Sequence, residues 1–189
     1  MTAALPGADG LARCPWGNST EDYAAYHDTE WGVPLHGEAA LYERLCLEAF
    51  QSGLSWLTIL RKRQGFRAAF AGFEPKRVAE FGPADVERLM NDVSIVRNRA
   101  KIDATIRNAK AIAELDTPLD ELLWSFAPAG HRRPELTSDV PAITPESTAM
   151  AKALKKRGFA FVGPTTAYAL MQATGMVDDH LVTCWRASA

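Results

Sequence analysis

Residues 38–56 read EAALYERLCLEAFQSGLSW. On a helix of about 100° per residue, Leu41, Leu45 and Glu48 fall on one stripe, and Glu43 lies on the opposite face. A carboxylate on an apolar stripe is costly unless it is paired, protonated or used for binding. The stretch therefore predicts a helix that carries Glu48 on its buried side.

The end of this helix has the features of a pocket. Gly53 permits a break in the chain, and Trp56 supplies a large flat surface just beyond it. A desolvated carboxylate beside an aromatic ring can hold a flat ligand that donates hydrogen bonds. The alternative is a structural ion pair between Glu48 and Arg44 or Arg61, and the stretch by itself leaves both interpretations open.

Composition indicates an ordinary globular protein. The chain has 189 residues, of which 47% are hydrophobic and 23% charged. No apolar run approaches the roughly 18 residues of a membrane span, and the N-terminus lacks the pattern of a signal peptide. We therefore expect a cytoplasmic protein, with a flexible tail at 1–12 and a single helical domain at 13–189. Three cysteines in such a chain argue against a disulfide framework, and Cys46 is expected to stay a free thiol.

Helical patterns dominate, and no alternating strand pattern stands out. We predict an all-α domain of about eight helices, with a proline-rich surface loop at 127–147. The longest periodic stretch runs from Ile95 to Leu115. The other predicted helices include 38–51, 56–63, 84–90, 119–126, 148–157 and 165–174.

The net charge of −2 hides an uneven distribution. The windows 49–73 and 147–177 contain bases but no acids, and 93–113 contains Asp103 as its only acid. If these windows meet in space, they form a phosphate-binding face. The alternative is a set of ordinary solvated helix faces.

Two Cys/His pairs near the chain ends suggest a metal site. On a helix, His180 and Cys184 would share one face, and Cys14 and His27 form a second pair. Two thiolates and two imidazoles make a closed tetrahedral zinc set, which is typical of a structural site. The alternative is a pair of buried cysteines with surface histidines.

Several motifs follow one another in a recognisable order: RCPW at 13–16, YHDTEWGVP at 26–34, LE at 47–48, GLSW at 53–56, ALKKRGF at 153–159 and DH at 179–180. Through them the chain, from Arg13 to about Cys184, resembles the bacterial DNA-3-methyladenine glycosylase I family. The resemblance implies an all-α helix-hairpin-helix glycosylase fold, in which a structural zinc joins the N- and C-terminal segments.

The resemblance also implies roles for particular residues. The zinc ligands would be Cys14, His27, His180 and Cys184. Glu48 would hydrogen-bond the damaged base as the catalytic-site carboxylate, among the aromatic residues Tyr26, Trp56, Trp16 and Tyr23.

DNA contacts follow from the same resemblance and from the basic windows. The Gly53–Leu54 corner would occupy the gap left in the DNA, and residues 95–102 would form the hairpin. Ser94 stands where the family tends to have glycine, so the hairpin backbone is expected to differ slightly. The cationic contacts to phosphate would come from Arg97, Arg99, Lys101, Lys155, Lys156 and Arg157.

The implied activity is that of a monofunctional glycosylase. It would flip 3-methyladenine out of alkylated double-stranded DNA and remove it by hydrolysis, without a lyase step. The free base is then a product, and a monomer is the default state. Two other classes remain. The first is a zinc hydrolase or deaminase, which needs an open metal position and, for the deaminase signature, a Cys-x-x-Cys motif that this chain lacks. The second is a non-catalytic DNA-binding module, which needs no buried carboxylate.

Overall fold

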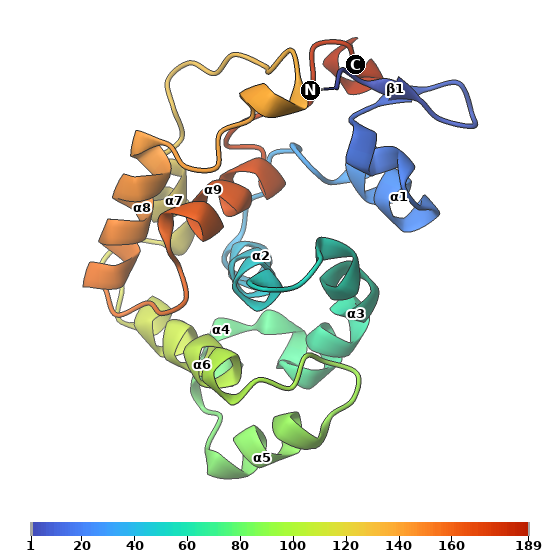
Figure 1. Cartoon of the computed structure of the whole chain (residues 1–189). Helices are drawn as coiled ribbons and strands as arrows, with labels where there is room; N and C mark the ends of the chain where they lie inside the picture. Colours follow the sequence, from blue (N-terminus) through green and yellow to red (C-terminus); the bar gives the residue numbers. More distant parts are fainter. Residues whose placement is uncertain (1, 189) are drawn as a thin grey trace.

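Helices account for most of the chain in the computed structural model, which describes residues 2–188 (Figure 1). The all-helical prediction is confirmed in its main feature, with nine α-helices rather than about eight within residues 2–188. They are α1 Glu21–Thr29, α2 Glu38–Gln51, α3 Trp56–Ala69, α4 Pro75–Ala79, α5 Pro83–Asn91, α6 Arg99–Ala113, α7 Leu119–Trp124, α8 Pro145–Lys156 and α9 Pro164–Ala173.

Helix α2 lies at the centre of the molecule (Figure 1). It packs against α3 on one side and α9 on the other, and it also contacts α6 and α7. Its residues Leu41, Leu45 and Phe50 are fully buried. Because α2 is covered on several sides, Glu48 is buried as well, at 6% exposure, as the helical pattern predicts.

Side-chain caps explain where several helices begin. Thr20, Ser55, Asn98 and Thr144 each accept a hydrogen bond from the backbone N–H three residues further on. The cap at Asn98 corrects one prediction. Residues 95–98 were expected to be helical, but they precede the cap, so α6 begins only at Arg99. Likewise α8 begins at Pro145, because Thr144 caps it before the expected start.

Two short strands depart from the purely helical prediction. Leu5–Pro6 (β1) pairs in antiparallel register with Ala12–Arg13 (β2). This hairpin is held further by Arg13, whose guanidinium pairs with Asp9 at 2.6 Å and with Asp28 at 2.7 Å. The segment before the domain is therefore hydrogen-bonded to it in this structure, whereas its flexibility stays a prediction.

The chain after α9 is irregular. Gly175 has a φ of +72°, and a Cβ there would lie 2.5 Å from the backbone nitrogen of Pro34. This close approach turns the chain, and residues 177–184 then form no helix. The prediction that His180 and Cys184 share a helical face is therefore wrong. The turn nevertheless brings the two chain ends together (Figure 1).

The remaining connections are short 3-10 turns: η1 Pro15–Asn18, η2 Ala71–Phe73, η3 Thr137–Asp139 and η4 Trp185–Ser188. The turn η3 lies inside the predicted proline-rich loop. Across residues 2–188, no helix has the length and apolar character needed to cross a membrane.

Candidate functional site

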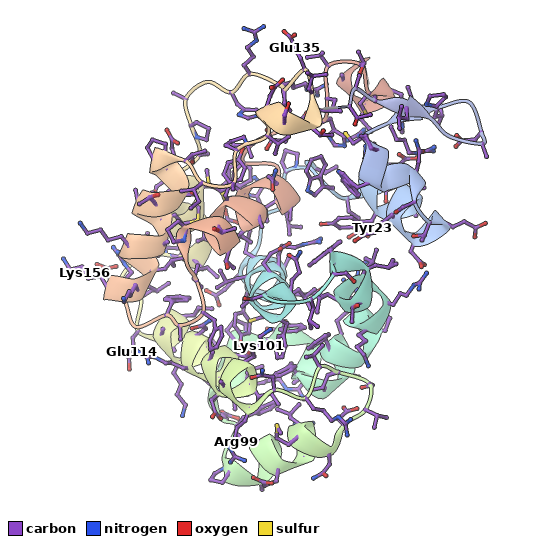
Figure 2. The ribbon with its side chains drawn as sticks, viewed as in Figure 1. Tyr23, Arg99, Lys101, Glu114, Glu135 and Lys156 are labelled. Carbon is purple, nitrogen blue, oxygen red and sulfur yellow. The ribbon has the colours of Figure 1, made fainter. Side chains whose placement is uncertain are left out.

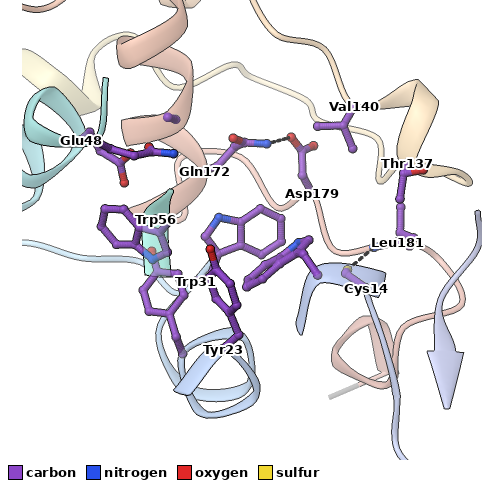
Figure 3. A pocket seen from close by; sticks show the side chains of 14 residues that line it. Cys14, Tyr23, Trp31, Glu48, Trp56, Thr137, Val140, Gln172, Asp179 and Leu181 are labelled. Carbon is purple, nitrogen blue, oxygen red and sulfur yellow. Dashed lines mark hydrogen bonds between the residues drawn. The ribbon is translucent and has the colours of Figure 1, made fainter. Parts of the chain in front are cut away.

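A pocket of about 380 Å³ opens between η1, α1, α2, α3 and α9 (Figure 3). Aromatic side chains form much of its wall. Its polar residues include Glu48, Gln51, Gln172 and Asp179. The aromatic residues that line it are Trp16, Tyr23, Tyr26, Trp31 and Trp56.

The aromatic rings form a connected wall. The Trp16 ring lies 5.5 Å from that of Tyr23 and 5.0 Å from that of Trp31, both edge to face. Tyr26 and Trp56 lie 5.4 Å apart. The four aromatic residues assigned to one site from sequence thus meet, although they come from three separate elements. Trp31 entered the sequence argument only as part of a motif, because nothing in its spacing places it near Trp56.

The side-chain carboxylate of Glu48 forms no hydrogen bond or ion pair with any protein group within residues 2–188. Burial raises the pKa of its carboxyl group to about 7, and the positive charge of Arg44 opposes this rise. The side chain is therefore a buried acceptor that lines the pocket without a protein partner.

The structural alternative for Glu48 was an ion pair with Arg44 or Arg61. Arg44 instead pairs with Glu30 at 3.2 Å, and Arg61 pairs with Asp22 at 2.7 Å. Both candidate cations are thus engaged elsewhere. This arrangement favours the interpretation of Glu48 as a ligand-binding group.

Sequence reasoning missed a second polar cluster in the pocket. The Nε2 of Gln172 donates to Asp179 Oδ2 at 2.8 Å, and the hydroxyl of Tyr168 donates to the same oxygen at 2.7 Å. This hydrogen bond holds the amide of Gln172 with its Nε2 toward Asp179 (Figure 3). Helical periodicity could place Gln172 on α9, but nothing in the sequence places it opposite α2.

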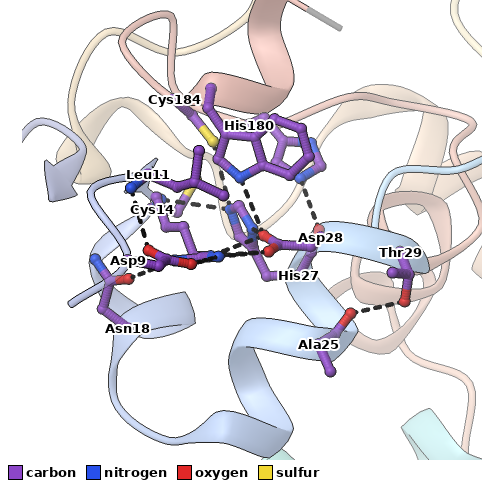
Figure 4. Close-up of polar contacts among 12 residues, drawn as sticks. Asp9, Leu11, Cys14, Asn18, Ala25, His27, Asp28, Thr29, His180 and Cys184 are labelled. Atoms are coloured by element: carbon purple, nitrogen blue, oxygen red, sulfur yellow. Dashed lines mark hydrogen bonds and ion pairs between the residues drawn. The ribbon is translucent and has the colours of Figure 1, made fainter. Parts of the chain in front are cut away.

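A compact group of side chains that could hold a metal ion, called the metal-binding group below, lies beside the pocket (Figure 4). Cys14, His27 and Cys184 each offer one ligand atom, and these atoms lie within 4.8 Å of one another. All three residues are buried. The structure thus brings together three of the four residues expected to bind metal.

His180 lies next to this group without being part of it. Its ring centroid is 4.7 Å from that of His27, and its Nε2 is 3.3 Å from the backbone oxygen of His27. Each imidazole has a carboxylate at Nδ1, with Asp28 2.8 Å from His27 and Asp178 2.7 Å from His180. A carboxylate at Nδ1 is common behind metal-bound histidines, because this hydrogen bond orients the ring so that Nε2 faces the ion.

The two cysteine sulfurs influence each other's ionisation. The neighbouring Cys14 sulfur lowers the pKa of Cys184, whereas Cys184 and burial raise the pKa of Cys14. Such a pair of buried thiols fits a soft cation, which would bind the deprotonated sulfurs.

The residues expected to contact DNA separate into two groups. Leu54 is 41% exposed beside Gly53, which has a φ of +80°. Arg97 is exposed, and so is Arg99, although Arg99 pairs with Glu87 at 2.7 Å. The exposed cluster Lys155, Lys156 and Arg157 ends α8.

Lys101 does not fit the expectation of a surface cation. It is only 7% exposed, and its Nζ donates to two backbone oxygens at the end of α2. Its assignment as a phosphate contact stays a prediction, and the burial of its charge speaks against it, because Nζ already bonds groups inside the protein.

The first basic window is also engaged. Arg61, Arg63 and Arg67 form ion pairs with Asp22, Glu30 and Glu43, respectively. Asp22 lies in α1, Glu30 directly follows α1, and Glu43 lies in α2. Although the window itself contains no acids, these acids from other segments neutralise its three arginines. The windows at 93–113 and 147–177 keep their exposed cations.

A helical protein with an aromatic, carboxylate-bearing pocket belongs to the class that binds a flat, hydrogen-bonding ligand such as a nucleobase. Residues 16–187 match the family described as methyladenine glycosylase. The chain belongs to this family and is therefore a glycosylase.

Individual relatives agree with this assignment. The chain is 46% identical over 182 residues to DNA-3-methyladenine glycosylase 1 of Escherichia coli, a match that covers 92% of this chain and 96% of the relative. It is 44% identical over 178 residues to DNA-3-methyladenine glycosylase of Haemophilus influenzae, with 91% and 96% covered.

The fold is similar to solved structures of the same kind. A crystal structure of 3-methyladenine DNA glycosylase I superposes with a TM-score of 0.88 at 44% identity, covering 92% of this chain and 98% of that one. A structure of the Staphylococcus aureus enzyme, described as showing the basis of 3-methyladenine recognition, gives a TM-score of 0.86 at 36% identity. There the shares are 92% and 95%.

Proposed function

We propose that this protein removes 3-methyladenine from alkylated double-stranded DNA by hydrolysis of the glycosidic bond. The observation that carries the proposal is the buried carboxylate of Glu48, which lies in an aromatic pocket and has no protein partner in the part of the chain that the structure describes. Membership of the methyladenine glycosylase family and the names of the relatives support the same activity.

Recognition of the base follows from its charge. A base in a duplex must rotate out of the stack before it reaches such a pocket. Methylation at position 3 gives adenine a delocalised positive charge, which aromatic faces attract through their quadrupole. The aromatic wall that includes Tyr26 and Trp56 supplies these faces.

Glu48 adds selectivity. Its carboxylate can accept a hydrogen bond from the exocyclic amino group of adenine, whereas guanine presents an acceptor at the same position. A positive base also favours the ionised form of Glu48, whose pKa burial has raised to about 7. Ligand binding thus relieves the free energy cost of the buried carboxylate.

Bond cleavage needs little activation, because the cationic base departs as a neutral molecule. A water molecule would attack the sugar. No lysine lines the pocket among the residues that the structure describes, and this supports a single-function enzyme without an imine intermediate.

Release of 3-methyladenine from alkylated duplex DNA, followed by chromatography, tests the activity. Wild type should release 3-methyladenine much faster than 7-methylguanine, and borohydride should trap no adduct. Equal release of both bases would contradict the role of Glu48. A trapped imine would contradict the hydrolytic mechanism.

We also propose a structural zinc held by Cys14, His27, His180 and Cys184. The two thiols and the His27 imidazole, which lie close together, and the carboxylates behind both imidazoles support this assignment. His180 would complete the set by turning its Nε2 from the backbone oxygen of His27 to the metal. A four-ligand site has no open position, so the metal would hold the chain ends together rather than take part in the reaction.

Metal analysis of purified protein tests the zinc site. We expect one zinc per chain in wild type and a large loss in the Cys184→Ser variant. Cys46→Ser is the matched control, because Cys46 is a buried thiol in α2 outside the metal-binding group. Folded, active protein with almost no zinc would refute the assignment.

The DNA-binding face, in our proposal, combines three segments. They are the turn and first residues of α6 at 95–102, the Gly53–Leu54 corner, and the cluster Lys155–Arg157. Hydrogen bonds from α6 hold the other two segments. Arg107 donates to the backbone oxygen of Gly158, just after the cluster, at 2.6 Å. Lys101 donates to the backbone oxygen of Phe50, just before the Gly53–Leu54 corner. The protein would act as a monomer in the bacterial cytoplasm.

A further inference from the structure

Lys101 has an unusual position for a lysine in the first turn of a helix. Its Nζ donates to the backbone oxygen of Phe50 at 2.9 Å and to that of Ser52 at 2.6 Å. Figure 2 labels the side chain where α6 meets α2. With only 7% of its surface exposed, the ammonium group is directed into the protein.

The two acceptors lie at the end of α2. The last carbonyl groups of a helix have no partner within the helix, and the negative end of the helix dipole favours a cation. Lys101 satisfies both conditions with a charge-assisted pair of hydrogen bonds. Burial lowers the pKa of this lysine, but two carbonyl acceptors favour its charged form.

The segment that Lys101 holds leads directly to the exposed corner. Ser52 precedes Gly53, whose φ of +80° turns the chain, and Leu54 N donates to Gln51 O at 2.6 Å. Leu54 is then presented to solvent at 41% exposure. Residues 52–55 are exposed, so the direction of the corner depends on how the end of α2 is fixed.

We propose that Lys101 is a positioning residue that fixes the Gly53–Leu54 corner for entry of Leu54 into the duplex. The inference rests on the proposed role of this corner in DNA. Lys101 touches neither the base pocket nor, in this proposal, a phosphate. It links α6, whose preceding turn would lie on the DNA backbone, to the side chain that would fill the gap left by the flipped base.

Three alternatives predict different measurements. A direct phosphate contact would make Lys101 contribute to the salt dependence of DNA binding, with a slope of about 0.9 per contact. A general structural role would weaken the pocket as much as the DNA step. A nucleophilic role would give an imine adduct with DNA.

The experiment compares Lys101→Met and Lys101→Gln with the control Lys76→Met, which removes an exposed lysine of α4 outside the basic windows. For each protein we would measure affinity for free 3-methyladenine, single-turnover excision from alkylated duplex, and the salt dependence of duplex binding. Lys101→Gln retains an uncharged N–H donor group and keeps the test possible if Lys101→Met does not fold.

We expect Lys101→Met to slow excision from duplex by about tenfold or more, equivalent to about 1.4 kcal/mol. Affinity for the free base should stay within about twofold, and the salt slope should not change. The slowing should shrink on alkylated single strands, where no base has to leave a stack. A smaller salt slope, a parallel loss of free-base affinity, or unchanged excision would each overturn the proposal.

A double variant tests whether Lys101 acts through Leu54. If it does, Lys101→Met combined with Leu54→Ala should excise no more slowly than Leu54→Ala alone. Additive losses would overturn the proposal. Failure of the proposed function is separately visible, because wild type would then release no 3-methyladenine, or Leu54→Ala alone would excise at the wild-type rate.

Discussion

Replacement of Glu48 by glutamine should stabilise the protein at alkaline pH while it weakens base binding. Burial raises the pKa of Glu48 from 4.5 to about 7. In the unfolded chain this carboxyl group ionises near its ordinary pKa, whereas in the folded protein it keeps its proton up to about pH 7. The wild-type protein therefore loses stability as the pH rises from about 4.5 to about 7.

The size of this effect follows from the shift. A difference of about 2.5 pKa units, at 1.36 kcal/mol each, corresponds to about 3 kcal/mol. Glutamine does not titrate. The stability of Glu48→Gln relative to wild type should therefore rise by about 3 kcal/mol between about pH 4.5 and about pH 8, and stay constant above that. Burying the glutamine amide also changes the free energy of unfolding, but by an amount that does not depend on pH. This amount therefore does not affect the predicted rise between the two pH values.

Urea unfolding of both proteins at several pH values measures the effect. Subtracting one curve from the other removes the contribution of the remaining titrating groups. Glu38→Gln serves as the control, because it is the same substitution at the exposed start of the same helix, and it should show no such pH dependence. A difference between Glu48→Gln and wild type that does not vary with pH would refute the reasoning.

The same variant should lose function. A hydrogen bond to a charged group contributes about 1.5–3 kcal/mol, so affinity for free 3-methyladenine should fall by roughly 10- to 150-fold. If the variant is more stable at about pH 8 yet binds the base less well, then the carboxylate of Glu48 lowers the stability of the protein and at the same time increases its affinity for the base. Full activity of Glu48→Gln would contradict the pocket assignment.

Further predictions concern the wall of the pocket, the metal and the DNA. Trp56→Ala should weaken binding of the free base by about 1–3 kcal/mol through lost stacking, measurable by calorimetry; unchanged affinity would place the base elsewhere. Asp28→Asn should lower zinc affinity by about 10- to 100-fold, because it removes the carboxylate behind His27. Competition with a chelator measures this affinity, and an unchanged value would contradict the role of Asp28. Affinity for duplex should fall as salt rises, and charge reversal of Lys155 and Lys156 should reduce the slope by about 0.9 for each phosphate that is no longer neutralised; a salt-independent affinity would contradict the DNA-binding face.

Local rules in the sequence were sufficient for most helices. Residues 38–51 indicate a helix by their apolar stripe, and the helix predicted from residue 56 begins there in the structure. These features depend on neighbours within about one helical turn, which is why they can be predicted. The prediction for the end segment failed for the same reason, since the close approach of Gly175 to Pro34 is a contact between distant residues.

The candidate site shows a similar division. The sequence by itself determined which chemical groups are present: an acid on an apolar stripe, four aromatic residues near it in the motifs, and two Cys/His pairs. Resemblance to a known family assigned them to one function. Neither argument could place Gln172 and Asp179 in the pocket, because their position depends on how α9 packs against α2.

Tertiary structure decided which charges are free. Local sequence could not show that Arg44 and Arg61 pair with acids of other segments and leave Glu48 alone, nor that Lys101 turns inward to the end of α2. The physical reason is that a charged group is neutralised by whatever lies within a few ångströms of it, and in a folded chain those neighbours come from distant parts of the sequence.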